Sequence, residues 1–481
     1  MNPMKLAGLE PACVFGYFEK ICSIPHGSRN TKLISDYLVS FAQEHGIRYE
    51  QDELNNVVMY QEGTCGMEDH APVILQGHMD MVCEKDADCP INMDTDGLDI
   101  SHDGQWVFAN GTTLGGDNGI AVAYMLALLA DKSIAHPPLE IIITVDEEIG
   151  MEGAAGVDLS RLQGCRMINL DSEDEGIFTV SCAGGIRTMI CMPVERRVVY
   201  GPCVKLTVEG LRGGHSGVEI HKNLANANKV MGEFLARVQQ LMPLCITKLS
   251  GGAKDNAIPR SCEVTLVPLG MYIERINDIA AQLQAEIREK YDEPYAIVRG
   301  DDVDALGGNA LTTECSSKLI SLLNAAPNGV QAMSEDIEGL VQTSLNLGVV
   351  TLDETALNLT FALRSSVNQE KTDLRNRLKE LAQFHGAEVM EMGDYPAWEY
   401  KKDSALRDTM VSTFKKMFDK DPQVVAIHAG LECGLLSEKL PGLDCVSIGP
   451  DMQDIHTSRE KLNIASTERT WKFLLEVLKS L

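Results

Sequence analysis

The sequence predicts an α/β fold with a mainly parallel sheet flanked by helices, plus an inserted α+β domain. Two observations support the parallel sheet: short apolar runs are bounded by turn residues, and helical segments lie between them. A third observation supports the insertion, because the pattern of elements changes after the glycine pair Gly184-Gly185. The apolar runs span residues 73–75, 139–145, 167–170 and 445–448.

The N-terminal part opens with apolar residues at helical spacing, which predict helices over 14–24 and 31–46. A third helix is predicted at 120–130, between the first two strand runs. The last strand run lies far downstream, where the chain returns to the same pattern. We therefore expect residues 1–184 and 396–481 to form one discontinuous domain.

The inserted domain is expected over residues 185–395. Its predicted order is strand, helix, strand, strand, helix, strand, followed by a similar second set, which is typical of split β-α-β units with helices on one face of an open sheet. The clearest elements are strands 204–208 and 357–363 and helices 224–241, 276–291 and 371–385.

Composition and charge narrow the class of protein. The chain has 481 residues, of which 44% are apolar and 23% charged, as in an ordinary soluble globular protein of several domains. Its net charge of −28 disfavours nucleic acid and anionic membrane surfaces as partners. We find no signal-peptide pattern and no apolar run of membrane-spanning length. The 14 cysteines form no CxxC pair, which favours a reducing compartment, and we predict a cytoplasmic protein.

Histidine or acidic residues follow each of the four predicted strands. These are His78 and Asp80, the run Asp146-Glu147-Glu148, Asp171, and His456 in the last loop. Ligands of open α/β sheets collect at the carboxyl ends of the strands, so we expect these side chains to meet at one edge.

Each motif has an ordinary structural interpretation beside the functional one. Asp80 shares a face with His78 and would orient its imidazole, or the pair is merely a polar strand end. Asp117, in Gly115-Gly116-Asp117-Asn118-Gly119, either caps the following helix or bridges two ions. The run 146–148 is either a solvated acidic loop or supplies one metal ligand and one proton-transfer group. Together, two histidines and three carboxylates match a two-metal hydrolytic site for zinc, cobalt or manganese.

Six motifs in this order resemble the di-zinc aminoacylase/carboxypeptidase/dipeptidase family, and within it the branch of aminoacyl-histidine, or cytosolic non-specific, dipeptidases. The resemblance covers nearly the whole chain. It implies zinc-dependent hydrolysis of dipeptides with a free N-terminus, two Zn²⁺ per subunit with Co²⁺ or Mn²⁺ as substitutes, and a homodimer whose inserted domain serves as lid and dimerisation domain. The motifs are GHMDMV (77–82), GGDNG (115–119), DEEIG (146–150), Leu170-Asp171-Ser172, GGHSG (213–217) and DIHTSRE (454–460).

The resemblance also implies a role for each residue at the metal centre. Asp117 would bridge both zinc ions, with Glu147 as the general base that activates the bridging water and Asp80 as the partner of His78. The terminal ligands would be His78 and Asp171 on one ion and Glu148 and His456 on the other.

Further residues are implied in substrate binding. His215 would reach the active site of the partner subunit and support the oxyanion, while Arg364 and Asn256 would hold the substrate carboxylate or backbone. The loop 428–434 departs from the Gly-Gly-Thr-Asp type of most relatives, and within it Gly430 and Glu432 are expected substrate contacts.

Two alternatives stay open. One is an N-acyl-amino-acid deacylase or carboxypeptidase on the same scaffold, and the other is a non-catalytic metal-binding or peptide-binding protein. Glu147 distinguishes the second alternative, because a general base that need not bind metal argues for turnover.

Overall fold

The computed structural model describes residues 5–270 and 273–481. Contacts within the chain divide it into two compact units. Unit 1 comprises the chain up to Ser181 together with Tyr400–Ala426 and Leu431–Leu481, and unit 2 comprises Cys182–Glu399 and Ile427–Gly430.

Unit 1 is built on an eight-stranded sheet with the strand order β1-β2-β6-β3-β7-β23-β8-β22. The four central strands, β6, β3, β7 and β23, are parallel, which confirms the predicted parallel sheet. Strands β1, β2 and β8 pair antiparallel at its flanks. The bounds are β1 Arg48–Gln51, β2 Val57–Gln61, β3 Val73–His78, β6 Leu139–Thr144, β7 Arg166–Asn169, β8 Ile177–Cys182, β22 Gln423–Ile427 and β23 Asp444–Ser447.

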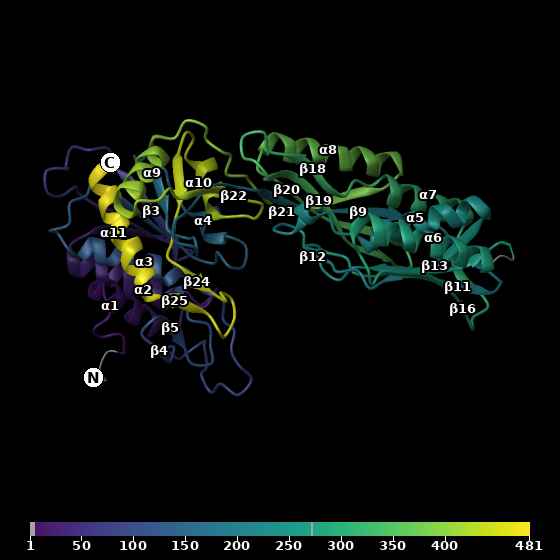
Figure 1. Cartoon of the computed structure of the whole chain (residues 1–481), viewed down its shortest axis with the longest axis horizontal. Helices are drawn as coiled ribbons and strands as arrows, with labels where there is room; N and C mark the ends of the chain where they lie inside the picture. Colours follow the sequence, from purple (N-terminus) through teal and green to yellow (C-terminus); the bar gives the residue numbers. More distant parts are fainter. Residues whose placement is uncertain (1–4, 271–272) are drawn as a thin grey trace. The chain divides into compact units, whose positions relative to one another are not determined.

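The helices of unit 1 pack against this sheet in one apolar core. Helix α3 is apolar on every side and almost wholly buried, as expected of a helix in the middle of a core. The C-terminal helix α11, yellow in Figure 1, lies beside it: the ring of Tyr124 stacks on that of Trp471 at 5.8 Å, and its hydroxyl donates to the carbonyl of Thr467. The bounds are α1 Ala12–Cys22, α2 Lys32–His45, α3 Gly116–Ala130, α4 Glu152–Gly156, α9 Ala405–Phe418, α10 Glu432–Lys439 and α11 Ile464–Ser480.

A small four-stranded sheet completes unit 1, in the order β24-β25-β5-β4. It joins the C-terminal loop that carries His456 to a hairpin from the first quarter of the chain. The bounds are β4 Ile100–His102, β5 Trp106–Ala109, β24 Met452–Gln453 and β25 Lys461–Asn463.

Unit 2 is built on a nine-stranded sheet in the order β16-β11-β15-β13-β19-β20-β9-β21, with β18 paired to β19. Neighbouring strands run antiparallel. Helices α5, α6, α7 and α8 share one apolar core with the sheet. The bounds are β9 Gly184–Pro193, β11 Cys203–Glu209, β13 Leu244–Gly251, β15 Cys262–Pro268, β16 Ile297–Val303, β18 Gly329–Met333, β19 Val341–Leu352, β20 Ala356–Ser365, β21 Glu388–Tyr395, α5 Ala227–Leu241, α6 Ile273–Tyr291, α7 Thr313–Ala325 and α8 Asn368–Phe384.

Unit 2 also contains two shorter ribbons, which are β10 Arg196–Val199 with β17 Gly308–Leu311 and β12 Gly214–His215 with β14 Ala257–Ile258. A 3-10 turn at Ile220–Lys222 follows β12 along the chain. The glycine pair at 184–185 is the start of strand β9 rather than a break in structure. A Cβ atom on Gly185 would lie 2.5 Å from the hydroxyl oxygen of Tyr395, so the glycine allows β9 to pass this side chain.

Within the described part of the chain, no helix is both long and apolar enough to cross a bilayer.

Candidate metal centre

The predicted ligands of unit 1 gather at the carboxyl ends of the parallel strands. Strand β3 ends at His78, Glu148 follows β6, and Asp171 follows β7. Because β6, β3 and β7 are neighbours in the sheet, their ends bring these three side chains to one edge.

His78 is buried at this edge, with its Nε2 facing two carboxylates and its Nδ1 facing a backbone carbonyl. Its Nε2 lies 3.2 Å from Oδ1 of Asp117 and 3.4 Å from Oδ1 of Asp171, and its Nδ1 lies 2.9 Å from the carbonyl oxygen of Asp80. Burial opposes a charge on the imidazole, but Asp171 and Asp117 outweigh it and raise the pKa of His78 well above its usual value. Since Nδ1 donates to a carbonyl, Nε2 is the nitrogen that is available to a cation.

Asp117 stands between the two histidines. Its Oδ2 lies 3.2 Å from Nε2 of His456, while its other oxygen faces His78. Burial would raise the pKa of Asp117, but the hydrogen bonds with His456 and His78 lower it below its usual value. One oxygen toward each histidine is the arrangement of a carboxylate shared between two positive centres.

His456 completes the group from the far end of the chain. Its Nε2 lies 3.0 Å from Oε1 of Glu148, and the hydrogen bonds with Asp117 and Glu148 raise the pKa of His456 to about 10. Burial raises the pKa of the Glu148 carboxyl, although the bond with His456 acts against this.

These side chains fit a divalent metal. One ligand atom each from His78, Asp117 and Glu148 lie within 4.8 Å of one another, and the distances above add Asp171 and His456 to the same group. Imidazole nitrogens and carboxylate oxygens are ligands of zinc, manganese and cobalt. The chain therefore holds a candidate metal-binding group at the edge of its parallel sheet.

Asp80 is fully buried and ties the group to the loop after β6. Its Oδ2 accepts from the hydroxyl of Ser28 at 2.8 Å, and its Oδ1 accepts from the backbone N–H of Glu147 at 3.1 Å. Burial would raise the pKa of Asp80, but hydrogen bonds with His78 and Ser28 lower it. Glu147 is itself half-buried; burial, followed by repulsion from Asp171 and Glu432, raises its pKa well above the usual value despite the opposing charge of His78.

Sequence reasoning gave no role to Asn118 or Glu460, although both stand inside the quoted motifs. The buried side chain of Asn118 accepts from the N–H of His78 at 3.2 Å and donates to the carbonyl of Leu170 at 2.8 Å. It therefore links the ends of β3 and β7. Its position directly after Asp117, inside the GGDNG motif, was the one feature of the sequence that could have pointed to this role.

The two predicted substrate contacts in the loop 428–434, Glu432 and Gly430, belong to different units. Glu432 is fully buried, and its Oε2 accepts from Thr144 at 2.6 Å and from Gln76 at 2.5 Å; burial raises its pKa to about 7. Gly430 belongs to unit 2 and packs on an aromatic ring, since a Cβ there would lie 2.8 Å from Cε2 of Tyr395. A substrate contact at either residue stays a prediction.

His215, Asn256 and Arg364 also belong to unit 2. Strand β12 carries His215 and pairs with β14, which directly follows Asn256. Nδ1 of His215 accepts backbone N–H groups at 3.2 and 3.3 Å, so the network assigns the ring proton to Nε2, and burial together with the charge of Arg364 lowers its pKa. Arg364 and Asn256 line one pocket, where Nη1 of Arg364 donates to the hydroxyl of Tyr395 at 3.1 Å.

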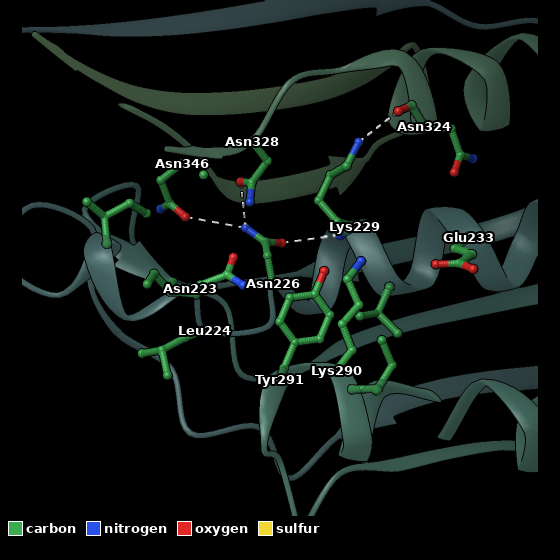
Figure 2. A pocket seen from close by; sticks show the side chains of 15 residues that line it. Asn223, Leu224, Asn226, Lys229, Glu233, Lys290, Tyr291, Asn324, Asn328 and Asn346 are labelled. Carbon is green, nitrogen blue, oxygen red and sulfur yellow. Dashed lines mark hydrogen bonds between the residues drawn. The ribbon is translucent and has the colours of Figure 1, made fainter. Parts of the chain in front are cut away.

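A separate cavity in unit 2 is lined by five asparagines together with charged and apolar residues (Figure 2). Asn226 caps helix α5 and donates to the side-chain oxygens of Asn328 and Asn346. The ammonium of Lys229 donates to three backbone carbonyls at the end of α7, including that of Asn324. These polar groups bond to one another or to the backbone, and the predicted site residues do not line this cavity.

Comparisons with known proteins agree on one family. The model of peptidase family M20/M25/M40 matches residues 74–480. The chain is 38% identical over 485 residues to the cytosol non-specific dipeptidase of Escherichia coli (strain K12), covering 99% of each chain. It is similar to the structure of an aminoacylhistidine dipeptidase from Vibrio alginolyticus, with a TM-score of 0.94, 35% identity, and coverage of 99% of this chain and 98% of that one. Aminopeptidase PepT from Bacillus cereus ATCC 10987 shares the fold, with a TM-score of 0.57 at 14% identity and coverage of 98% and 99%.

Proposed function

Because the chain belongs to peptidase family M20/M25/M40, we propose that it is a metal-dependent dipeptidase that hydrolyses dipeptides with a free N-terminus, Xaa-His among them. The observation that carries the proposal is the adjacency of Glu147, whose pKa is raised, to the group formed by His78, Asp117 and Glu148. The full-length similarity to two dipeptidases supports the choice of substrate.

The metal is proposed to be a pair of zinc ions in each subunit. Asp117 would contact both ions, because it turns one oxygen toward His78 and the other toward His456. When bound, the two ions supply Lewis acidity to the attacking water and to the scissile carbonyl. His78 with Asp171 and His456 with Glu148 are the pairs that would hold one ion each, as their distances of 3.4 and 3.0 Å support.

Glu147 is proposed as the general base. A raised pKa lets its carboxylate take a proton from water and later pass that proton to the leaving amine. Asp80 holds the backbone of Glu147 through the bond to its N–H, and it lies next to His78. In this proposal Glu147 exchanges protons, while Asp80, whose pKa is lowered, stays ionised. Two neighbouring carboxyl groups with pKa values shifted in opposite directions divide the roles of acid–base chemistry in this way.

The residues of unit 2 are proposed to bind the substrate. The Nε2–H of His215 is a neutral donor suited to the developing oxyanion, and the guanidinium of Arg364 is suited to the substrate carboxylate. Unit 2 would act as lid and dimerisation domain of a homodimer in which His215 serves the partner's site. We also propose a cytoplasmic location, in line with the cytosolic relative.

The test is release of histidine from Ala-His by the zinc-loaded protein. We expect turnover by the wild type and a loss of about 1000-fold in kcat for Glu147→Gln, which should keep its zinc. Glu152→Gln, an exposed acid on the next short helix, is the matched control and should match the wild type. Hydrolysis of N-acetyl amino acids in place of Ala-His would overturn the dipeptidase proposal, and sedimentation equilibrium tests the homodimer.

A further inference from the structure

Glu460, the last residue of the DIHTSRE motif, holds four consecutive backbone N–H groups. Its Oε2 accepts from Leu114 at 2.8 Å and Gly115 at 3.1 Å, and its Oε1 accepts from Gly116 at 2.8 Å and Asp117 at 3.3 Å. The side chain is buried, with 3% of its surface exposed. Both oxygens of the Glu460 carboxylate therefore accept hydrogen bonds from the same loop.

These N–H groups surround the start of helix α3. The first N–H groups of a helix have no partner inside the helix, and Gly115, the residue before α3, has no side chain to cap them. The glycines also make room for the carboxylate: a Cβ on Gly116 would lie 3.2 Å from Oε1 of Glu460. A residue more than 340 positions away in sequence thus caps this helix.

The same contact joins the two loops that carry metal-binding candidates. Asp117 donates the fourth N–H, and His456 stands four residues before Glu460 in the other loop. Through their side chains, Asp117 and His456 meet at 3.2 Å. Two contacts therefore join the loop of Asp117 to the loop of His456. One is the bond of Glu460 to the backbone, and the other is the side-chain contact at the metal centre.

We propose that Glu460 is a positioning residue, which holds Asp117 and His456 at the separation that the metal requires. The inference rests on the proposed function, since it concerns the affinity of that metal site. A local cap at Gly115 would satisfy the helix equally well, but it would not tie the loop of Asp117 to the loop of His456. Loss of Glu460 should consequently weaken metal binding, in addition to any loss of stability.

The experiment measures zinc affinity by competition with a chromophoric chelator, and the absorption spectrum of the Co²⁺-loaded protein. In Glu460→Gln an amide NH₂ faces backbone N–H groups, so we expect zinc affinity to fall at least tenfold and the cobalt spectrum to change. Glu140→Gln is the matched control: Glu140 is a buried carboxylate that accepts from the N–H groups of Gln163 and Gly164, away from the metal ligands. It should lose stability but keep the wild-type zinc affinity and cobalt spectrum.

Gly116→Ala serves as a second variant: its Cβ would lie 3.2 Å from Oε1 of Glu460 and 3.1 Å from Sδ of Met452, so it crowds the carboxylate without removing its charge. We expect a smaller loss of zinc affinity in the same direction, so the inference stays testable if Glu460→Gln does not fold. Unchanged zinc affinity and cobalt spectrum in a folded Glu460→Gln, or in Gly116→Ala if the former does not fold, would overturn the positioning role. Failure of the wild type to bind zinc would instead overturn the proposed metal site, which separates the two results.

Discussion

Nε2 of His456 lies 3.0 Å from Oε1 of Glu148, although 308 positions separate the two residues in sequence. His456 also meets Asp117, and these two carboxylates raise its pKa to about 10. Two carboxylates and an imidazole this close together are ligands that suit a divalent cation, which makes the metal centre the first place to test.

Asp117→Asn should remove the carboxylate that is proposed to contact both metal ions. An amide offers one neutral oxygen in place of two charged ones, so we expect zinc content to fall below one ion per chain and kcat/KM to fall at least about 100-fold. Metal analysis by mass spectrometry and hydrolysis of Ala-His check this. Asp131→Asn, at the exposed end of the same helix, should retain full metal and activity; a fully loaded Asp117→Asn would contradict the shared role.

Asp80→Asn should weaken activity without emptying the site. The substitution removes the charge beside His78 and disturbs the bond to the N–H of Glu147, and losses of 10–100-fold are typical for such partners of metal ligands. Steady-state kinetics on the zinc-loaded variant provide the measurement. Ser28→Ala deletes only one donor to Asp80, so its loss should be much smaller; equal losses in both variants would speak against the role of the charge.

Tyr395→Phe should affect substrate binding more than catalysis. Its hydroxyl accepts from Nη1 of Arg364, so its removal leaves the guanidinium less well oriented toward a substrate carboxylate. We expect KM for Ala-His to rise several-fold while kcat stays within about twofold. Tyr200→Phe, at an exposed tyrosine, should leave both constants unchanged. A fall in kcat alone would contradict this assignment.

His428 should make the folded chain less stable in mild acid. Burial, followed by the charge of Arg364, lowers its pKa to about 4, so the unfolded chain binds a proton more readily between this value and about 6.5. The contribution of neutral His428 to the free energy of unfolding is therefore present above pH 6.5. It is lost as the pH falls toward 4, by about 3 kcal/mol in total.

Urea denaturation at pH 7 and pH 4.5, with a chelator present throughout, measures this contribution. The free energy of unfolding of the wild type should fall more between the two pH values than that of His428→Gln, whose amide does not titrate. His221→Gln, at an exposed histidine, should follow the wild type. Parallel pH dependence in the wild type and His428→Gln would show that the histidine already titrates normally.

The elements that could be predicted are those with a strong local pattern. Strand β3 and helix α3 are almost wholly apolar, and such segments are stable only in a core, so their pattern identifies them. Strands β1 and β21 escaped prediction because they are only partly buried and carry many polar residues. Tertiary pairing, rather than their own composition, keeps them in the sheets.

The sequence by itself determined which chemical groups follow the strands and in what order, since motifs such as GGDNG and DIHTSRE are local. Only the tertiary structure decided which of these groups meet. The contacts of His456 with Glu148 and of Glu460 with Gly116 join loops more than 300 positions apart. Those distances depend on the order of the strands and the packing of α3, which spacing along the chain does not encode.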